Sequence, residues 1–255
     1  WPGIRPPVTR AEMFALAAQD DVESRLVVRG ADVPDGWRVS RGPIARRSLP
    51  PIGRREWTLL VQGLDLHRES ARALLEPFRF VPEARFDDLM ISWASDGGGV
   101  GPHVDAYDVF LLQVAGRRRW RVGRVADAAH IEGLPLKILQ RFEPEFDWVL
   151  EPGDMLYLPP LWGHDGVADG ECMTCSVGFR SPDALGLSAE LLQRLADGDD
   201  ERGTLYRDPK QPATANPGQV PAALAEFART ALARRMAGPG ALERALGEAL
   251  SEPKP

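Results

Sequence analysis

Four histidines occur among the 255 residues, and one of them stands two positions before an aspartate, in His103-Val-Asp105. In an extended strand, residues i and i+2 point to the same side, so this imidazole and this carboxylate can reach one point. A third ligand from a later strand, for which His164 is the candidate, would complete a set of two histidines and one carboxylate. Such a set leaves positions on an Fe(II) ion open for a chelating cosubstrate and dioxygen. The alternative is that both histidines are structural.

The other two histidines, His67 and His130, also stand two residues before a carboxylate, in these cases a glutamate. His67 leads into a segment with a helical pattern, where residues i and i+2 diverge by about 200°. His130 lies in a polar stretch without strand character, so we interpret both as surface residues. His103 instead follows a glycine-rich loop and precedes a strongly β-forming run, while His164 follows a predicted strand and two prolines. These surroundings favour His103, Asp105 and His164 as the metal site.

One arginine of the basic run at residues 117–121 is expected to face inward. If the run continues as a strand to Val122, Arg118 shares a face with Trp120 and Val122, and the other arginines form a solvated stripe. An unpaired buried charge is very costly, and a carboxylate that accepts two hydrogen bonds is the natural partner of an arginine. That carboxylate is either an Asp or Glu of the same protein or the distal carboxylate of 2-oxoglutarate, whose keto-acid end would chelate the metal.

Two serines and two cysteines are weaker candidates. Ser92 and Ser176 lie in predicted strands near the proposed site, where they either bind the cosubstrate or are ordinary strand residues. Cys172-Met-Thr-Cys175 has the spacing of a zinc-ligand pair. However, residues i and i+3 of a strand face opposite ways and no second pair follows, so we expect no zinc site.

The charge balance limits the partners. The chain has 31 Lys+Arg and 37 Asp+Glu, a formal net charge of −6. This balance argues against general nucleic-acid binding and is compatible with a basic protein partner. An arginine-rich stretch at residues 36–55 has two interpretations, a contact with RNA or a solvated loop, and the acidic total favours the loop. We therefore expect no direct contact with nucleic acid.

The composition also bears on the compartment. The sequence contains no run of 18 apolar residues, so we expect no transmembrane helix and no membrane association. The first residues lack the basic and apolar regions of a secretory signal. Two cysteines cannot form a disulfide framework, which favours a cytoplasmic location.

The pattern predicts a β-rich core followed by helices. Thr9 and Glu12 form a capping box that opens a helix to about Asp20, and helical periodicity recurs at residues 68–75. Strands are expected at residues 57–62, 89–93, 109–114, 118–122, 155–158 and 173–179, separated by Gly/Pro turns, a spacing typical of a sandwich or barrel. We expect residues 36–55 to be irregular. After Pro182 the strands stop, and helices are expected at 188–196, at 222–236 and around residues 242–250, with a polar linker at 197–218.

Several segments together resemble one family closely. They are residues 87–92 (DDLMIS), 97–105 (GGGVGPHVD), 106–110 (AYDVF), 116–122 (GRRRWRV), 151–160 (EPGDMLYLPP), 176–180 (SVGFR) and His164. They are similar to the JmjC-type ribosomal oxygenases of bacteria, and the resemblance extends over about residues 1–250. It implies a double-stranded β-helix, the cupin or JmjC barrel, at residues 1–182 and a helical dimerisation region at 183–255.

The resemblance also implies an activity and roles for residues. Members of this family use Fe(II), 2-oxoglutarate and dioxygen to hydroxylate the β-carbon of an arginine in the sixteenth large-subunit ribosomal protein. By position, His103, Asp105 and His164 are similar to the iron ligands and Arg118 to the anchor of the 2-oxoglutarate carboxylate, and Ser92 stands where the family has a residue near the cosubstrate and substrate. We expect contacts with the substrate from Tyr107, Asp108 and Asp96.

Two alternatives stay open at this point. The same centre could hydroxylate a histidine or demethylate a lysine, and the barrel could also be a catalytically silent binding protein. The family usually continues into a winged-helix-like domain, whereas this sequence ends at Pro255. We expect either a shortened chain or a short member of the family.

Overall fold

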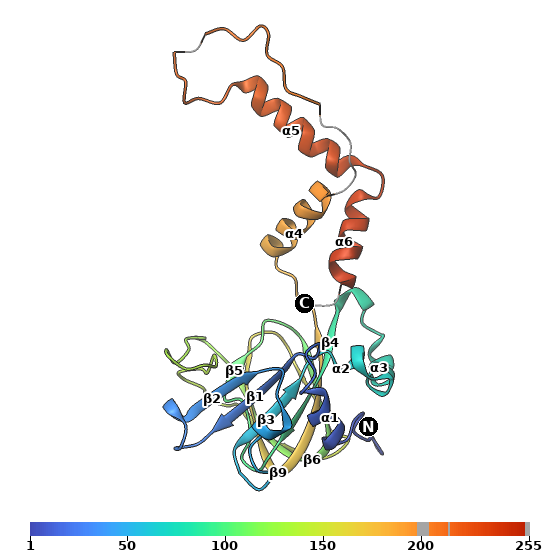
Figure 1. The fold of residues 1–255 in the computed structure, drawn as a ribbon, viewed down its shortest axis with the longest axis vertical. Coiled ribbons are helices and arrows are strands. Elements are labelled where there is room, and N and C mark those ends of the chain that lie inside the picture. Colours follow the sequence, from blue (N-terminus) through green and yellow to red (C-terminus); the bar gives the residue numbers. More distant parts are fainter. Residues whose placement is uncertain (198–203, 214, 253–255) are drawn as a thin grey trace. The chain divides into compact units, whose positions relative to one another are not determined.

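The computed structural model describes residues 1–197, 204–213 and 215–252 (Figure 1). The chain divides into two compact units, the first being Trp1–Ser181 and the second beginning at Pro182. The assignment of separate roles to residues 1–182 and 183–255 stays a prediction.

The first unit is built on nine antiparallel strands, whose order is β2-β1-β3-β4-β9-β6-β7, with β5 paired to β9 and β8 paired to β6. Two of them, β6 and β9, are much longer than the rest and pair with each other along most of their length. The strands are β1 (Ser24–Arg29), β2 (Trp37–Arg41), β3 (Trp57–Val61), β4 (Phe86–Ala94), β5 (His103–Val104), β6 (Val109–Arg124), β7 (Phe146–Leu150), β8 (Met155–Leu158) and β9 (Trp162–Phe179).

Three α-helices accompany the strands of the first unit. They are α1 (Arg10–Leu16), α2 (Leu64–His67) and α3 (Glu69–Leu75), and short 3-10 turns lie at Pro34–Gly36, Arg46–Ser48, Glu76–Phe78 and Glu83–Arg85. Helix α1 begins at the predicted capping box, where the Thr9 side chain accepts from the backbone of Glu12 and the Glu12 side chain accepts from the backbone of Thr9.

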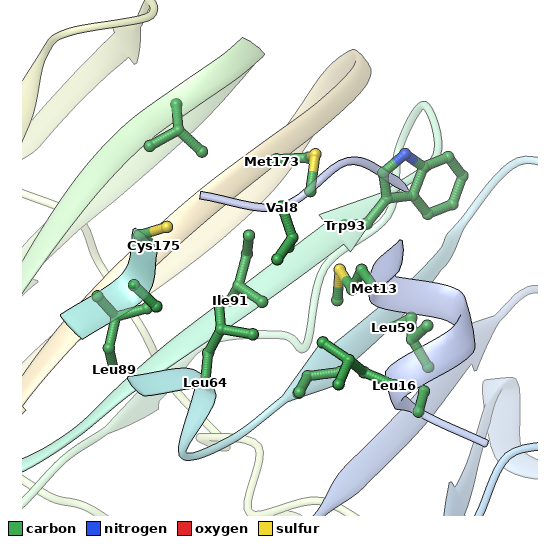
Figure 2. Packing of buried hydrophobic residues seen from close by; sticks show 14 of the residues in the cluster. Val8, Met13, Leu16, Leu59, Leu64, Leu89, Ile91, Trp93, Met173 and Cys175 are labelled. Carbon is green, nitrogen blue, oxygen red and sulfur yellow. The ribbon is translucent and has the colours of Figure 1, made fainter. Parts of the chain in front are cut away.

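One face of the sheet carries the main apolar core. Leu59 of β3 and Ile91 and Trp93 of β4 are fully buried, and Met13 and Leu16 of α1 pack in the same cluster (Figure 2). Alternate residues of a strand point to opposite sides, so the neighbours of these residues point to the other side of the sheet, which we call the inner face. Four of the predicted site residues lie on this inner face: Ser92, Arg118, His164 and Ser176.

Strand β6 changes its alternation in the middle. Leu111 packs on the inner face together with Trp120, whereas Leu112 belongs to the main core. Without an irregularity, the inward residues would all have odd numbers, and Arg118 would point outward. The register against β9 shifts between Gln113 and Arg117, a β-bulge that moves the inward positions from odd to even numbers. The bulge therefore turns Arg118 inward.

The β-rich prediction for residues 86–179 is confirmed, because β4, β6, β8 and β9 contain all five predicted segments. Segments 109–114 and 118–122 form one strand, since the bulge lets β6 continue between them. The expectation of an irregular stretch at 36–55 was wrong in part, because β2 lies there. Its three polar side chains and its position at the end of the strand order obscure the pattern of a buried strand.

The second unit contains three helices in its described part, as predicted. They are α4 (Ala184–Asp197), α5 (Ala222–Ala237) and α6 (Ala241–Ser251). Arg194 of α4 forms ion pairs with Glu190 on its own helix and with Glu252 just after α6. The predicted linker at 197–218 lies partly outside the described residues.

The bulge generates a test of stability. Gly116 has φ +61, and a Cβ there would overlap the backbone carbonyl oxygen of Glu171, which cannot move aside cheaply. Gly133 has φ +81 with no atom within 4 Å of such a Cβ. Gly133→Ala should cost about 1–2 kcal/mol for the left-handed backbone alone, whereas Gly116→Ala should cost about 2–5 kcal/mol because overpacking adds to that strain. Urea unfolding of both variants measures the difference, and equal losses would contradict the close approach at Gly116.

Candidate metal and cosubstrate site

The structure brings His103, Asp105 and His164 together. Their potential ligand atoms all lie within 4.8 Å of one another. His103 of β5 stands directly opposite His164 of β9, and their ring centroids are 4.2 Å apart. Oδ2 of Asp105 lies 3.5 Å from Nε2 of His164 and 3.9 Å from Nε2 of His103. Two imidazole nitrogens and one carboxylate thus converge on one point, as a site for a divalent first-row metal requires.

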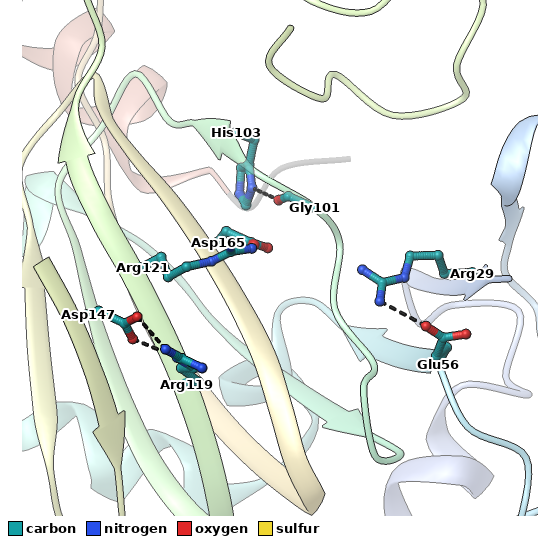
Figure 3. Close-up of polar contacts among 8 residues, drawn as sticks. All are labelled: Arg29, Glu56, Gly101, His103, Arg119, Arg121, Asp147 and Asp165. Atoms are coloured by element: carbon teal, nitrogen blue, oxygen red, sulfur yellow. Dashed lines mark hydrogen bonds and ion pairs between the residues drawn. The ribbon is translucent and has the colours of Figure 1, made fainter. Parts of the chain in front are cut away.

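The orientation of both rings suits metal binding through Nε2. Nδ1 of His103 lies 2.9 Å from the carbonyl oxygen of Gly101 (Figure 3), and Nδ1 of His164 lies 3.1 Å from that of Trp162. A carbonyl oxygen only accepts, so each Nδ1 carries the proton and each Nε2 keeps a free lone pair. Burial and the neighbouring His103 lower the pKa of His164 to about 4, so its ring is neutral at pH 7. The donor set therefore fits a metal ion.

Arg118 lies inside the barrel without a carboxylate partner. Its side chain is on the inner face of β6 and the residue is 5% exposed. Nη1 donates to Oγ of Ser92 at 3.2 Å, while Nε and Nη2 are buried and have no partner. No Asp or Glu of the described residues forms an ion pair with Arg118. Of the two predicted partners, a carboxylate of the same protein is therefore absent from the described structure. Two parallel N–H groups are left for a bound anion.

The flanking arginines behave differently. Arg117, Arg119 and Arg121 point to the other side of β6, and each forms an ion pair with an aspartate on a neighbouring strand. Figure 3 shows the pairs of Arg119 with Asp147 and of Arg121 with Asp165. These arginines are therefore paired rather than only solvated. Of the four arginines at positions 117, 118, 119 and 121, only the inward Arg118 lacks a carboxylate partner in the described structure.

Ser92 and Ser176 both lie on the inner face and are buried. Ser92 of β4 accepts from Arg118 and donates weakly to the carbonyl oxygen of Thr174 at 3.4 Å. Ser176 stands opposite Leu111 in β6 and Met90 in β4, in the same sheet but away from Arg118 along the strand. Of the two predicted serines, Ser92 is the one that contacts the arginine.

Sequence reasoning missed a polar pair that braces this region. Oγ1 of Thr174 donates to Oε1 of Gln113 at 2.8 Å, and Nε2 of Gln113 donates to the carbonyl oxygens of Ala115 and Gly116. Gln113 is fully buried and holds the two carbonyls of the bulge that turns Arg118 inward. A glutamine inside the apolar run at 109–114 was the available signal, because a buried polar side chain needs partners.

The three predicted substrate residues are placed differently. Burial and the neighbouring Asp105 carboxylate raise the pKa of Tyr107. Asp108 accepts from the hydroxyl of Tyr157 at 2.7 Å and pairs with Arg85 at 3.0 Å.

Asp96 accepts from the backbone N–H of Gly170 and pairs with Arg55 at 2.8 Å. The structure therefore places Tyr107 beside the triad and engages Asp108 and Asp96 in contacts within the chain.

The remaining candidates lie apart from the triad. His67 is at the end of α2 and His130 forms an isolated bridge to Leu139, and both are half-buried rather than exposed. Cys172 and Cys175 are buried free thiols in two different apolar clusters, as opposite faces of a strand require. Burial raises the pKa of Cys175.

Comparison with known proteins agrees with this geometry. Residues 73–187 match the family model described as "JmjC domain". The chain is 43% identical over 219 residues to the ribosomal protein uL16 3-hydroxylase of Escherichia coli K12, covering 84% of this chain and 56% of that protein. It is 37% identical over 202 residues to a probable ribosomal oxygenase of Haemophilus influenzae, covering 78% and 47%. The chain thus spans about half the length of these curated relatives.

Solved structures agree as well. The X-ray structure of E. coli YcfD matches with a TM-score of 0.81 at 38% identity, over 100% of this chain and 67% of that one. The structure of YcfD in complex with cobalt and 2-oxoglutarate matches with a TM-score of 0.76 at 37% identity, over 99% and 66%. Fold and site define a JmjC-type barrel, so the predicted fold class is confirmed. The chain belongs to the JmjC-domain family, in the group of the bacterial ribosomal oxygenases.

No helix in the described part of the chain has both the length and the apolar character needed to cross a membrane.

The triad can be tested by metal binding without turnover. Asp105→Ala removes the one charged ligand, and we expect Co(II) affinity to fall more than about 100-fold, since losing even a supporting partner of a ligand costs about 10–100-fold. Calorimetric titration with Co(II) under anaerobic conditions measures the change. Asp20→Ala, an exposed aspartate at the end of the first helical segment, is the control. Unchanged Co(II) affinity in Asp105→Ala would refute the triad.

Proposed function

We propose that this chain is the catalytic part of an Fe(II)- and 2-oxoglutarate-dependent oxygenase that hydroxylates the β-carbon of an arginine in the ribosomal protein uL16. The observation that carries the proposal is the buried Arg118, which offers two free N–H groups on the same face as a two-histidine, one-carboxylate triad. A carboxylate anchor beside an open metal site is what a chelating keto diacid needs. Two comparisons support the proposal. The E. coli relative is named a ribosomal protein uL16 3-hydroxylase, and the similar protein YcfD has a structure in complex with cobalt and 2-oxoglutarate.

The residues divide the work between metal and cosubstrate. His103, Asp105 and His164 hold Fe(II), and Nε and Nη2 of Arg118 receive the distal carboxylate of 2-oxoglutarate. Iron with 2-oxoglutarate and dioxygen supplies the oxidising chemistry that inserts one oxygen atom into a C–H bond, while the cosubstrate becomes succinate and carbon dioxide. Oγ of Ser92 accepts a hydrogen bond from Nη1 of Arg118. The edge of the guanidinium formed by Nε and Nη2 is therefore the one left for the ligand.

The chain also limits access of water and orients the ligands. Trp120 and Val122, next to Arg118 on the inner face of β6, are 5% and 2% exposed, so this wall of the site is apolar. A dry wall strengthens the hydrogen bonds of Arg118 to a carboxylate. Tyr107 lies near the Asp105 carboxylate, beside the residues that would hold the metal. Ser176 lies on the same inner face but away from Arg118, so Ser92 is the better candidate for a contact with the cosubstrate.

The identity of the substrate rests on the relatives and on charge. A net charge of −6 is suited to approach by a basic ribosomal protein, because charge of opposite sign speeds encounter. The target side chain must reach the metal from the open side of the triad, next to the half-exposed Tyr107. We propose Tyr107 as a contact of the substrate, and Asp108 and Asp96 as further candidate contacts, each of which is paired with an arginine of the chain.

We also propose that the protein is a homodimer in the cytoplasm. In the second unit, α5 and α6 leave large apolar side chains exposed, namely Leu224 at 36%, Leu232 at 57%, Met236 at 51% and Leu242 at 45%. A second copy that covers these side chains would remove apolar surface from water. The ribosomal relatives support a cytoplasmic place of action.

The carboxylate anchor predicts a selective kinetic effect. Arg118→Ala removes the partner of the 2-oxoglutarate carboxylate, and truncation of a buried charge pair costs about 2–5 kcal/mol. We expect the apparent KM for 2-oxoglutarate to rise at least about 30-fold with little change in Co(II) affinity. Arg117→Ala is the matched control, because Arg117 points outward and is half-exposed in its pair with Asp169. An unchanged KM in Arg118→Ala would refute the anchor.

The reaction itself is tested on the substrate. The anaerobically purified protein is incubated with Fe(II), 2-oxoglutarate, oxygen and uL16, and the product is examined by tandem mass spectrometry. We expect a gain of one oxygen atom on a single arginine. A gain of one oxygen atom on a histidine would instead indicate a histidyl hydroxylase. Loss of a methyl group from a lysine would indicate a lysyl demethylase. Absence of both product and succinate would favour a silent binding protein.

A further inference from the structure

The arginines between residues 36 and 55 are not explained by the proposed reaction. This segment contains six arginines and no lysine, aspartate or glutamate, so it carries six positive charges in a chain whose net charge is −6. Arg54 and Arg55 form ion pairs with Asp32 and Asp96. Four others have no side-chain hydrogen bond or ion pair within the described structure: Arg38, Arg41, Arg46 and Arg47.

Two arginines face each other directly across neighbouring strands. Arg41 of β2 stands opposite Arg25 of β1, so both side chains lie on the same face with Cβ atoms about 5 Å apart. Like charges in this arrangement are destabilising. No carboxylate of the described residues compensates them, since Glu23, two positions before Arg25 on the same face, forms no ion pair with either. Nε of Arg25 is moreover buried without a partner.

Protection of a sheet edge accounts for only part of this arrangement. Charged side chains on an edge strand discourage pairing with other sheets, and β2 ends the strand order. That reason suffices for Arg38 and Arg41. It does not apply to Arg25, because β1 is paired on one side with β2 and on the other with β3. A half-buried arginine on an inner strand, opposite another arginine, needs an anion from outside the chain.

The pair also lies in line with the site. Arg25 stands opposite Leu60 of β3, and Leu60 stands opposite Ser92 of β4, the residue that contacts Arg118. Strands are about 4.8 Å apart, so Arg25 lies about 10 Å from Ser92 across the same inner face. Figure 1 shows β2, β1 and β3 side by side. An anion held by this pair would therefore lie on the same face of the sheet as Ser92 and Arg118.

We propose that the Arg25–Arg41 pair binds phosphate groups of RNA. The guanidinium fork matches phosphate oxygens, and arginine without lysine is typical of such recognition. The acidic remainder of the chain repels phosphates elsewhere, so it confines RNA to this edge. The expectation of no nucleic-acid contact rested on the total charge, which averages over this local surface. The inference does not depend on which side chain the enzyme modifies.

Fluorescence anisotropy with the whole chain tests the proposal. The probe is a fluorescein-labelled single-stranded RNA of mixed sequence and about 20 nucleotides, longer than the usual footprint of single-strand binders. We expect Arg25→Gln/Arg41→Gln to bind at least about tenfold more weakly than the wild type. The slope of log K against log salt should fall by about 1.4, because each phosphate neutralised on a single strand contributes about 0.7.

A matched variant controls for charge. Arg79→Gln/Arg229→Gln loses the same two positive charges from exposed arginines that have glutamate partners, and it should keep the wild-type affinity and slope. Thermal unfolding controls for misfolding, since removal of the like-charge pair should leave the melting temperature unchanged or raise it.

Three results would overturn the proposal. One is failure of the wild type to bind the RNA at physiological salt, and another is an equal loss in both double variants. The third is unchanged RNA binding together with a raised KM for uL16 in Arg25→Gln/Arg41→Gln, which would assign the pair to a carboxylate of the polypeptide. Loss of RNA binding in Arg25→Gln/Arg41→Gln, with unchanged hydroxylation of free uL16, would support the RNA site. This result would hold whichever residue of uL16 is hydroxylated.

Discussion

A guanidinium buried inside a β-barrel, with two N–H groups unmet, is the constraint on which the site of this protein depends. Arg118 cannot stay charged and dry without an anion, and the described chain gives it a serine hydroxyl but no carboxylate. The arginine therefore defines both the charge and the shape of what binds beside it. Its three basic neighbours on β6 face outward and are each paired with an aspartate of the chain, so they create no such requirement.

The inward direction of Arg118 depends in turn on one extra residue in β6. The bulge near Gly116 changes which residues face inward, and Gln113 holds its carbonyls from within. Beyond the bulge, Val122 stands opposite His164, so the arginine and the metal ligand are set four residues apart along paired strands, about 13 Å. The long arginine side chain and a five-carbon diacid together can bridge that distance. A shift of one residue in β6 would turn Arg118 to the outer side of the strand, away from the triad.

The predictable parts of the site are those that depend on local spacing. His103 and Asp105 share a side because a strand alternates, and His164 reaches them because β5 and β9 pair in register. Arg118 was expected to face inward from its neighbours Trp120 and Val122, which is a local pattern too. The bulge was not predictable from the sequence. It is defined by the pairing of β6 with β9, a strand that lies about 50 residues later in the chain. The engagement of Asp96 and Asp108 by Gly170 and Arg85 depends on residues distant in sequence, which no spacing rule contains.

The total charge of the chain conceals a surface of opposite character. The chain as a whole is acidic, with a net charge of −6, which suits a basic polypeptide. Two strands away from Ser92, Arg25 and Arg41 oppose each other without a carboxylate, which suits phosphate. A basic protein segment bound to RNA presents both kinds of partner at once, the cationic side chains toward the metal and the phosphates beside them. An enzyme that met only the free, cationic polypeptide would gain nothing from two mutually repelling arginines, whereas one that met it bound to RNA would place phosphates against them.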